Sequence, residues 1–264
     1  MTHTNELVRM KDIRKTYGVT QVLKGLEFIV GEQEIVGLVG DNGAGKSTLI
    51  KILVGAVRPD EGAQILWRGK EVSIRKPLDA IELGIESIYQ DSSLVDELNV
   101  PRNLFLGREP VRHFGPFAFL DKAKMRREAT ELLSKIGIKK IDLRSPIGTM
   151  SGGEKQSIAI ARAMYFQKDL IILDEPTNHL GVEESNSVLD FVVAAKAAGH
   201  STIFITHNVH HIYQVADRIV VLRLGQIVGD LRKSETSMDE IEALILGKGP
   251  KIPDAEAKSN RKNS

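Results

Sequence analysis

The chain has 264 residues, of which 42% are hydrophobic and 27% charged, a composition typical of a globular protein with room for a core domain and an added subdomain. Its net charge of +1 offers no general attraction to nucleic acid, and the absence of cysteine excludes a disulfide scaffold or a thiolate metal site. No signal-peptide-like run is present, and no stretch reaches the roughly 18 uncharged apolar residues of a membrane-spanning helix. We therefore expect a cytosolic protein, without a nucleic-acid partner, whose membrane association runs through another protein.

The first third of the chain reads mainly as strands. Alternating apolar positions at 6–13 and 21–30 predict antiparallel strands, and the continuous apolar run at 34–40 predicts a buried strand. One apolar face predicts a helix from 46 to about 55, and residues 63–72 are typical of a hairpin. The N-terminal part is therefore expected to add a small antiparallel sheet.

The remaining chain alternates between helices and apolar strands. The region of about 91–165 reads as helical, and a buried strand beginning at 169 leads to a helix near 183–198. Another buried strand follows at 201–206, and a hairpin is expected at 218–230. Strands alternating with helices indicate a mostly parallel sheet, so the expected fold class is α/β.

The domain limits follow from composition. From about residue 248 the chain is rich in Lys, Asn, Ser and Pro without periodicity, which predicts a disordered polar tail over 248–264. One domain is expected at 5–247, with a helical subdomain at about 91–165. No internal repeat is present.

The segment GDNGAGKST carries the clearest chemical signal. It fits G-x-x-x-x-G-K-[ST] and lies between a predicted strand and a predicted helix, a context that disfavours an ordinary glycine-rich turn. Its backbone N–H groups can point at phosphate, its lysine can reach the outer phosphates, and its serine can ligate Mg²⁺. The predicted nucleotide-binding residues are Gly40, Asp41, Asn42, Gly43, Ala44, Gly45, Lys46, Ser47 and Thr48.

Two carboxylates close the predicted strand of LIILDEPTN. Because strand side chains alternate, Asp174 and Glu175 are expected to project in opposite directions. One suits a metal, directly or through water, and the other can accept a proton from an attacking water. The alternative is a solvated acidic strand end.

His207 directly follows the predicted strand STIFIT. The carboxyl ends of parallel strands line one crevice, so Gly40, Asp174 and His207 are expected to converge there. The alternative is a structural histidine. His210 and His211 read as helix-surface residues.

A second phosphate-type cradle is predicted in SGGEKQ. Ser151 offers a hydroxyl, while Gly152 and Gly153 let the N–H groups of a helix start approach an oxyanion closely. One phosphate loop already serves one triphosphate, so this second cradle raises the question of which anion it binds.

The order of these motifs resembles the ATP-binding subunits of ABC transporters, from about residue 5 to 247. Tyr17 matches the aromatic residue before the first strands, and Gln90 in SIYQD matches the glutamine that follows a strand. The resemblance implies a P-loop NTPase core of the RecA type, with an N-terminal antiparallel β subdomain and an inserted α-helical subdomain. It also implies that the protein binds ATP and Mg²⁺ and hydrolyses ATP.

The resemblance assigns a role to each matching position. Tyr17 would stack on adenine, the alternative being a half-buried strand residue. Gln90 would sense Mg²⁺ or the lytic water and pass closure to the membrane partner, the alternative being a surface amide. Ser47 and Asp174 would hold Mg²⁺.

The remaining roles concern the outer phosphates. Lys46 would hold the β- and γ-phosphates, Glu175 would polarise water, and His207 would orient the γ-phosphate. The signature at 151–153 would close over the γ-phosphate bound by a second subunit packed head to tail, which answers the question raised by the second cradle.

Some positions depart from the family pattern. Met150 replaces the usual leucine of the signature and Glu154 its glutamine, both mild changes. Gly181 stands where the loop after the acidic strand usually ends in an aspartate that links the two sites.

Several stretches resemble the importers of simple sugars, among them NLFLGREP and SMDEIEALILG. The single ATPase unit is similar to fructose-type members, because ribose-type members often fuse two units. The implied partners are a membrane permease, a second copy of the ATPase subunit and, indirectly, a sugar-binding protein outside the membrane. The stretch GREPVRHFGPFAF is expected to dock on the permease. The alternative is an ABC-type ATPase outside transport, such as a cofactor-assembly ATPase.

Overall fold

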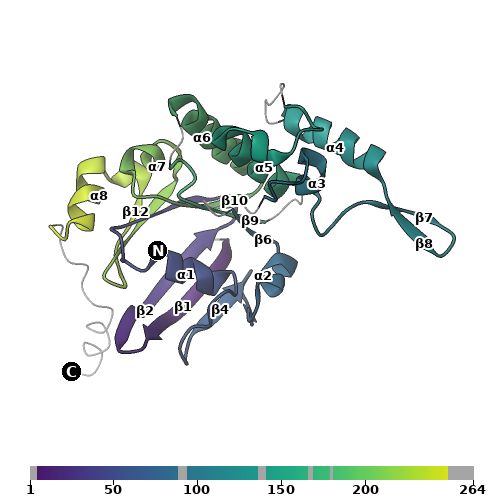
Figure 1. Cartoon of the computed structure of the whole chain (residues 1–264). Helices are drawn as coiled ribbons and strands as arrows, with labels where there is room; N and C mark the ends of the chain where they lie inside the picture. Colours follow the sequence, from purple (N-terminus) through teal and green to yellow (C-terminus); the bar gives the residue numbers. More distant parts are fainter. Residues whose placement is uncertain (1–4, 89–93, 136–140, 166–168, 179–180, 249–264) are drawn as a thin grey trace, which may run out of the picture.

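The computed structural model describes residues 5–88, 94–135, 141–165, 169–178 and 181–248 (Figure 1). Two larger sheets adjoin, with helices on both sides of the central one. The expected tail at 248–264 lies outside the described residues after Lys248, and remains a prediction.

A mostly parallel sheet forms the centre of the fold. Its strands are β3 (Ile35–Val39), β6 (Ile85–Ile88), β9 (Leu170–Asp174), β10 (Ser201–Ile205), β11 (Arg218–Arg223) and β12 (Gln226–Arg232). They lie in the order β12-β11-β3-β10-β9-β6. All neighbours pair in parallel except β12, which returns antiparallel along β11. The predicted α/β sheet is therefore confirmed.

An antiparallel sheet comes from the N-terminal part of the chain. Its strands are β1 (Glu6–Tyr17), β2 (Thr20–Gly31), β4 (Gln64–Trp67) and β5 (Lys70–Val72). They lie in the order β2-β1-β4-β5, and every pair is antiparallel. Both predicted features of this part, the first two strands and the short hairpin, are present.

The central strands divide their side chains between two cores, because successive residues of a strand face opposite sides of a sheet. In β3, Val36 and Leu38 pack toward the antiparallel sheet, whereas Ile35 and Val39 pack on the opposite face. Burial on both faces explains why the central strands read as continuous apolar runs in the sequence.

Helices cover both faces of the central sheet (Figure 1). On the side of the antiparallel sheet lie α1 (Lys46–Leu53) and α2 (Pro77–Leu83). The opposite side carries α6 (Val182–Ala197), α7 (Val209–Val215) and α8 (Met238–Ile245), and α5 packs next to α6. No helix in the described part of the chain is long and apolar enough to span a bilayer.

The region between β6 and β9 is not purely helical. It contains α3 (Val100–Leu104), α4 (Lys122–Lys135), a 3₁₀ turn (Ile147–Thr149) and α5 (Gly152–Tyr165). Between α3 and α4, however, the chain forms a hairpin of β7 (Val111–Phe114) and β8 (Phe117–Leu120), which points away from the body (Figure 1). Among the described residues, the prediction of helix at about 91–165 is wrong only at this hairpin, because proline stops helices and the phenylalanines favour strands.

One buried ion network ties the two sheets together and gives a stability prediction. The Arg218 guanidinium, on β11, donates to both carboxylate oxygens of Glu34 at 2.7 and 3.0 Å, to Asp230 at 2.8 Å and to the Ile29 carbonyl at 2.6 Å. Burial alone would lower the pKa of Arg218, but Glu34 and Asp230 reverse that effect and raise it. The cation therefore remains charged and paired with carboxylates.

We expect Arg218→Met to lower the free energy of unfolding by about 3–5 kcal/mol, because it leaves the partly buried carboxylate of Glu34 without its counter-charge. The matched control is Arg68→Met, which removes an exposed arginine paired with Glu32 and Asp169 and should cost about 1 kcal/mol or less. Urea unfolding followed by circular dichroism measures both. Equal effects of the two variants would contradict the assigned importance of the buried network.

Candidate functional site

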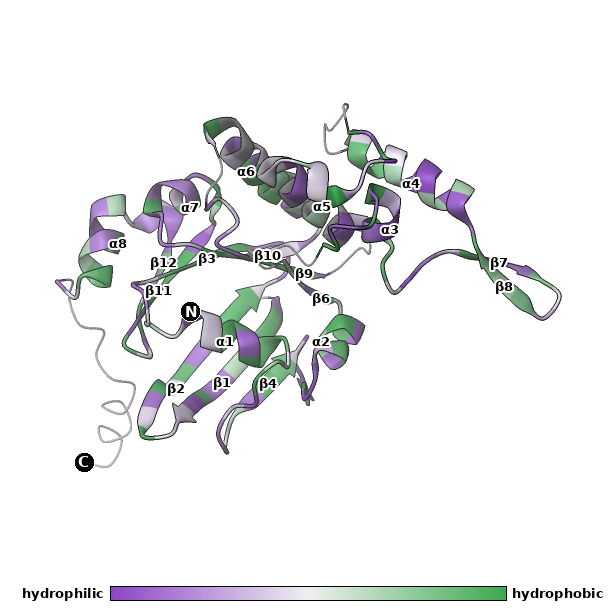
Figure 2. Ribbon diagram, in the orientation of Figure 1, coloured by the Kyte–Doolittle hydropathy of each residue, from purple (hydrophilic) through white to green (hydrophobic). Residues whose placement is uncertain are grey.

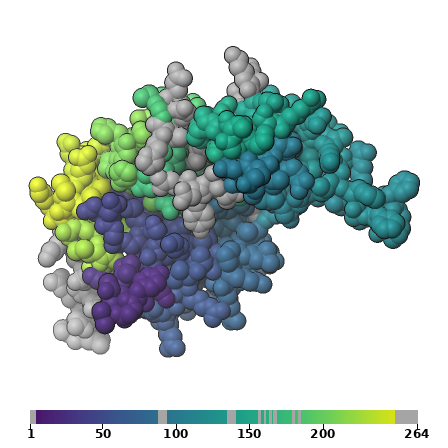
Figure 3. All heavy atoms as spheres, viewed as in Figure 1, coloured from purple at the N-terminus to yellow at the C-terminus, as the bar shows by residue number. Residues whose placement is uncertain are grey.

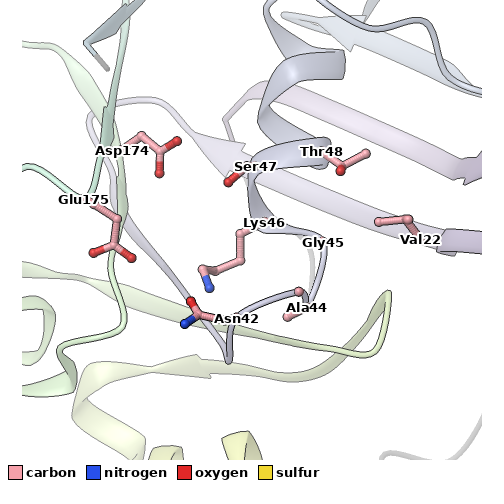
Figure 4. A pocket seen from close by; sticks show the side chains of 10 residues that line it. Val22, Asn42, Ala44, Gly45, Lys46, Ser47, Thr48, Asp174 and Glu175 are labelled. Atoms are coloured by element: carbon pink, nitrogen blue, oxygen red, sulfur yellow. The ribbon is translucent and has the colours of Figure 1, made fainter. Parts of the chain in front are cut away.

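The phosphate loop links the end of β3 to the start of α1 and borders a cavity of about 390 Å³ (Figure 4). Gly40 has φ 151°, and a Cβ there would lie 2.1 Å from the Leu222 carbonyl oxygen. Gly45 has φ 109°, and its Cβ would lie 2.7 Å from a Leu23 methyl group. Both positions therefore require glycine. The cavity is lined by Val22, Asn42, Gly43, Ala44, Gly45, Lys46, Ser47, Thr48, Asp174 and Glu175.

Lys46 brings a buried cation to this cavity. Its Nζ donates to the carbonyl oxygens of Gly40 at 2.7 Å and Asp41 at 3.0 Å. Burial lowers the pKa of Lys46, while Glu175, Asp174 and Asp41 oppose that effect. The ammonium is thus held by its own loop, next to space large enough for phosphate groups.

The two carboxylates of the acidic strand share that cavity. Asp174 is the last residue of β9, and burial followed by the nearby Glu175 raises its pKa, whereas Lys46 and Lys51 oppose the rise. The expectation that the two side chains diverge is wrong, since both line the cavity. The reason is a left-handed φ of 51° at Glu175, which ends the strand alternation, with its N–H donating to the Ile205 carbonyl at 2.9 Å.

His207 follows β10 and contacts the acidic strand end. Its Nδ1 lies 3.1 Å from each carboxylate oxygen of Glu175. The Glu175 side chain is 17% exposed and that of His207 is 59% exposed, so the imidazole covers the carboxylate from the solvent side. The predicted convergence at the carboxyl ends of the strands therefore includes a direct His207–Glu175 contact.

Tyr17 lies at the end of β1, beside the cavity but not in its lining. It pairs with Thr20 in the β1–β2 hairpin, and Val22, two residues further along β2, lines the cavity. Tyr17 is 47% exposed, with the Lys15 Nζ 5.3 Å from the centroid of its ring. An exposed ring at this place can receive a planar group. No sequence motif pointed to Val22.

The signature residues lie apart from this cavity. Ser151 and Glu154 form a reciprocal cap at the start of α5: the Ser151 Oγ accepts from the Glu154 N–H at 3.2 Å, and the Ser151 N–H donates to Glu154 at 2.8 Å. Among the described residues that line the phosphate-loop cavity, Ser151, Gly152 and Gly153 are absent. Within one chain the two anion cradles are therefore separate.

Gln90 lies outside the described residues, so its predicted role remains a prediction. Gly181 begins α6 as its N-cap without a side-chain hydrogen bond. His211 differs from its interpretation as a surface residue: it is half-buried and its Nδ1 lies 3.0 Å from the hydroxyl of buried Thr177. The contact joins α7 to the turn after Glu175, and no sequence pattern indicated it.

The described residues contain no group of three or more acidic, histidine or cysteine side chains that could hold a metal ion. Ser47 and Asp174, which line one cavity, supply an hydroxyl and a carboxylate, oxygen ligands that suit Mg²⁺. Mg²⁺ in such sites keeps several waters and takes oxygens from substrate phosphates as well. The residues present therefore fit a magnesium ion that arrives with a nucleotide.

A parallel sheet with a glycine-rich phosphate loop, a buried lysine and two carboxylates in one cavity defines a P-loop nucleotide-binding protein. The sequence pattern of the ABC transporter family matches residues 23–178. The chain belongs to this family, and it is an ATP-binding ATPase.

Relatives are similar over nearly the whole chain. The xylose/arabinose import ATP-binding protein XylG of Sulfolobus acidocaldarius is 41% identical over 241 residues, covering 91% of this chain and 94% of the relative. The fructose import ATP-binding protein FrcA of Rhizobium meliloti is 38% identical, with the same coverage of both chains. The ribose import ATP-binding protein RbsA 1 of Streptomyces avermitilis is 39% identical, but this chain spans only 46% of it.

Solved structures show the same fold. A nucleotide-free ATP-binding cassette of an ABC transporter superposes with a TM-score of 0.77 at 24% identity, covering 92% of this chain and 95% of the other. An ATP-binding cassette in its ADP conformation gives a TM-score of 0.77 at 22% identity, covering 98% and 99%. The expected cassette fold, with its antiparallel N-terminal part, is confirmed.

Proposed function

We propose that the chain is the ATP-hydrolysing subunit of an importer for a simple sugar, acting on the cytoplasmic side of a membrane with a separate permease. The observation that carries this proposal is the single cavity shared by the phosphate loop, Lys46 and the two carboxylates. Relatives whose names give xylose/arabinose and fructose import match over 94% of their own length, which supports a sugar as the cargo. A sugar-binding protein outside the membrane completes the proposed system.

The proposed ATP site uses the loop first. Its N–H groups surround the phosphates, and Lys46 exchanges the carbonyl oxygens of Gly40 and Asp41 for β- and γ-phosphate oxygens. Ser47 and Asp174 would hold Mg²⁺. That ion neutralises charge developing on the phosphates when it is bound. The raised pKa of Asp174 favours the same arrangement, because a cation relieves the burial of its carboxylate.

The proposed chemistry at the outer phosphate belongs to Glu175 and His207. The Glu175 carboxylate accepts a proton from the attacking water, and His207, already within 3.1 Å of it, fixes its direction and reaches the γ-phosphate. Gln90 is proposed to sense Mg²⁺ or this water and to report closure to the permease.

The proposed working unit is a head-to-tail pair of these chains. The signature residues 151–153 are separate from the cavity of their own chain, which supports a role against the nucleotide of a second subunit. Within each chain we propose one domain at 5–247, with the inserted subdomain at about 91–165. A role outside transport, such as cofactor assembly, remains the alternative.

Uptake of labelled sugars by a deletion strain tests the transport function. Restoring the wild-type chain should restore uptake of a pentose or hexose, whereas Lys46→Ala should not, because it cannot hold the outer phosphates. Lys70→Ala, which removes an exposed lysine on β5 outside the cavity, is the matched control and should restore uptake. Unchanged uptake of every sugar in the deletion strain would contradict the proposal and favour the alternative.

Tyr17 gives a prediction about the nucleotide base. A base stacked on an aromatic ring gains about 1 kcal/mol, so Tyr17→Ala should weaken ATP and GTP binding several-fold. Tyr17→Phe keeps the ring and should bind as the wild type does. Titration with a fluorescent ATP analogue measures the affinities, and an unchanged affinity of the alanine variant would make Tyr17 a structural residue.

A further inference from the structure

The β7–β8 hairpin, called the arm from here on (residues 111–120), exposes aromatic rings. Its strand pairs place Phe114 opposite Phe117 and Arg112 opposite Phe119, so these four side chains share one face. The three phenylalanines are 83%, 64% and 59% exposed, in chain order. In the space-filling view the arm stands clear of the other described atoms (Figure 3).

The other face of the arm is also mainly apolar. It carries Val111, Ala118 and Leu120, with His113 as its polar residue. Hydropathy colouring shows β8 as hydrophobic along its length (Figure 2). All eight strand residues are exposed. A protruding element that is apolar on both faces is suited to an apolar environment that surrounds it.

The base of the arm is strongly basic. Residues 108–127 include six lysine or arginine residues and two acidic ones, whereas the whole chain is nearly neutral. One of the acidic residues, Asp121, is buried, pairs with Arg112 and accepts from the Lys124 N–H at 2.9 Å. Lys122, Arg126 and Arg127 are exposed on α4. The exposed charge next to the aromatic rings is therefore mainly positive.

A cavity of about 280 Å³ lies at this base, between the starts of α3 and α4. Arg102, Lys122 and Arg126 supply three cations to its lining, and Met125 and Leu143 supply apolar walls. The Nε of Arg102 is buried and has no hydrogen-bond partner among the described residues. A buried donor without a partner is costly, and an anionic oxygen would satisfy it. We call this the cationic cavity.

We propose that the arm and the cationic cavity bind the surface of an anionic phospholipid membrane, with the phenylalanine rings inserted among the lipids and a headgroup phosphate in the cavity. The inference rests on the proposed function in one respect, that the chain works at a membrane. From the sequence we expect membrane association only through a partner protein. This inference adds direct contact between the chain and the lipids.

Lipid is favoured over the permease as the occupant for two reasons. An interfacial membrane anchor combines apolar residues that enter the headgroup region with basic residues that meet anionic lipids, and the arm and its base have both. The arm tip, from Phe114 to Phe117, contains no side chain that can form a hydrogen bond, so it offers little to select one protein surface.

Co-sedimentation of the full chain with vesicles tests the proposal. Binding to phosphatidylcholine vesicles that contain phosphatidylglycerol should exceed binding to pure phosphatidylcholine by about tenfold. Two double variants, Phe114→Ser with Phe117→Ser and Lys122→Glu with Arg126→Glu, should each reduce binding to the anionic vesicles by about tenfold or more. These side chains are exposed, so thermal unfolding should show intact folds.

Matched controls come from exposed residues elsewhere. Leu246→Ser removes an apolar side chain that is 63% exposed, and Lys70→Glu reverses a charge on a different hairpin; both should bind vesicles as the wild type does. The arm and cavity variants should also keep wild-type ATP binding, because none of their residues lines the nucleotide cavity.

Three results would overturn the proposal. The wild type could fail to sediment with anionic vesicles, or the arm variants could bind vesicles normally and lose only their association with the permease in detergent, which would assign the arm to the permease. In a third result, glycerol phosphate could remove the difference in vesicle binding between the wild type and the cavity variants while the wild type stays bound to the vesicles. That result would assign the cavity to a soluble anion. Absence of vesicle binding by the wild type, together with intact ATP hydrolysis and sugar uptake, rejects this inference alone. Unchanged uptake of every sugar in the deletion strain, together with vesicle binding by the wild type, rejects the transport function alone.

Discussion

Glu175→Gln is expected to reduce ATP turnover by about 10²-fold or more while ATP binding persists, since the amide cannot accept the proton of an attacking water. The substitution changes no shape, and the phosphate loop with Lys46 stays intact on the other side of the cavity. Binding without hydrolysis should also accumulate an ATP-bound dimer. Phosphate release under steady-state conditions measures the rate, and size-exclusion chromatography with ATP measures the dimer.

The matched control for this experiment is Glu71→Gln, on the exposed edge strand β5 and outside the nucleotide cavity. It makes the same carboxylate-to-amide change and should hydrolyse ATP at the wild-type rate. His207→Ala provides a second comparison, because it removes the group that lies 3.1 Å from the Glu175 carboxylate. Near wild-type hydrolysis by Glu175→Gln would show that Glu175 is not the base.

Features that depend on local sequence were predictable. The strands β3, β9 and β10 were predicted because strands buried on both faces must be apolar at nearly every position. The phosphate loop was predictable because each fixed residue has its own chemical role: the glycines expose N–H groups, the lysine reaches the outer phosphates and the serine can ligate Mg²⁺. The capping box of Ser151 and Glu154 also has a sequence signature, a serine followed three residues later by a glutamate. The prediction from sequence did not include this cap, because the two glycines between them indicated an anion cradle.

Features that depend on contacts between distant segments were not predictable. The direction of Glu175 depends on a left-handed backbone conformation, supported by a hydrogen bond to Ile205 thirty residues later. The contact between His211 and Thr177 likewise needs α7 to pack beside the turn after β9. The cationic cavity joins Arg102 of α3 to residues of α4. These residues are separated in the sequence and come together only because the two helices pack.

For the arm, the prediction from sequence was wrong for a different reason. Val111 to Leu120 contains strand-forming aromatic and branched residues around a Gly-Pro turn, and this pattern is sufficient to predict a hairpin. The prediction of a helical region rests on the helical periodicity of the residues that follow, at 125–138. The observed φ of 60° at Gly115 fits its place in the tight turn.

Mixing two inactive variants should restore nucleotide trapping, if the signature acts on the nucleotide of the other subunit. Lys46→Ala cannot hold the phosphates in its own cavity, and Ser151→Arg blocks the cradle at the start of α5. Each homodimer then has two damaged sites. A mixed dimer has one site with both defects and one site with an intact Lys46 and an intact partner signature.

The structure makes this design specific, because Ser151 is exposed and lies outside the lining of the cavity that holds Lys46. The arginine also removes the cap of α5, which costs about 1 kcal/mol. Ser151→Ala is therefore the matched control: it loses the same cap and the hydroxyl but leaves the cradle open, so it should trap more nucleotide than Ser151→Arg. Trapping of labelled nucleotide is a better measurement than turnover, since hydrolysis can require both sites. If the cradle acted within its own chain, every subunit would keep its defect, and a mixture with proven mixed dimers would trap no more nucleotide than its separate components.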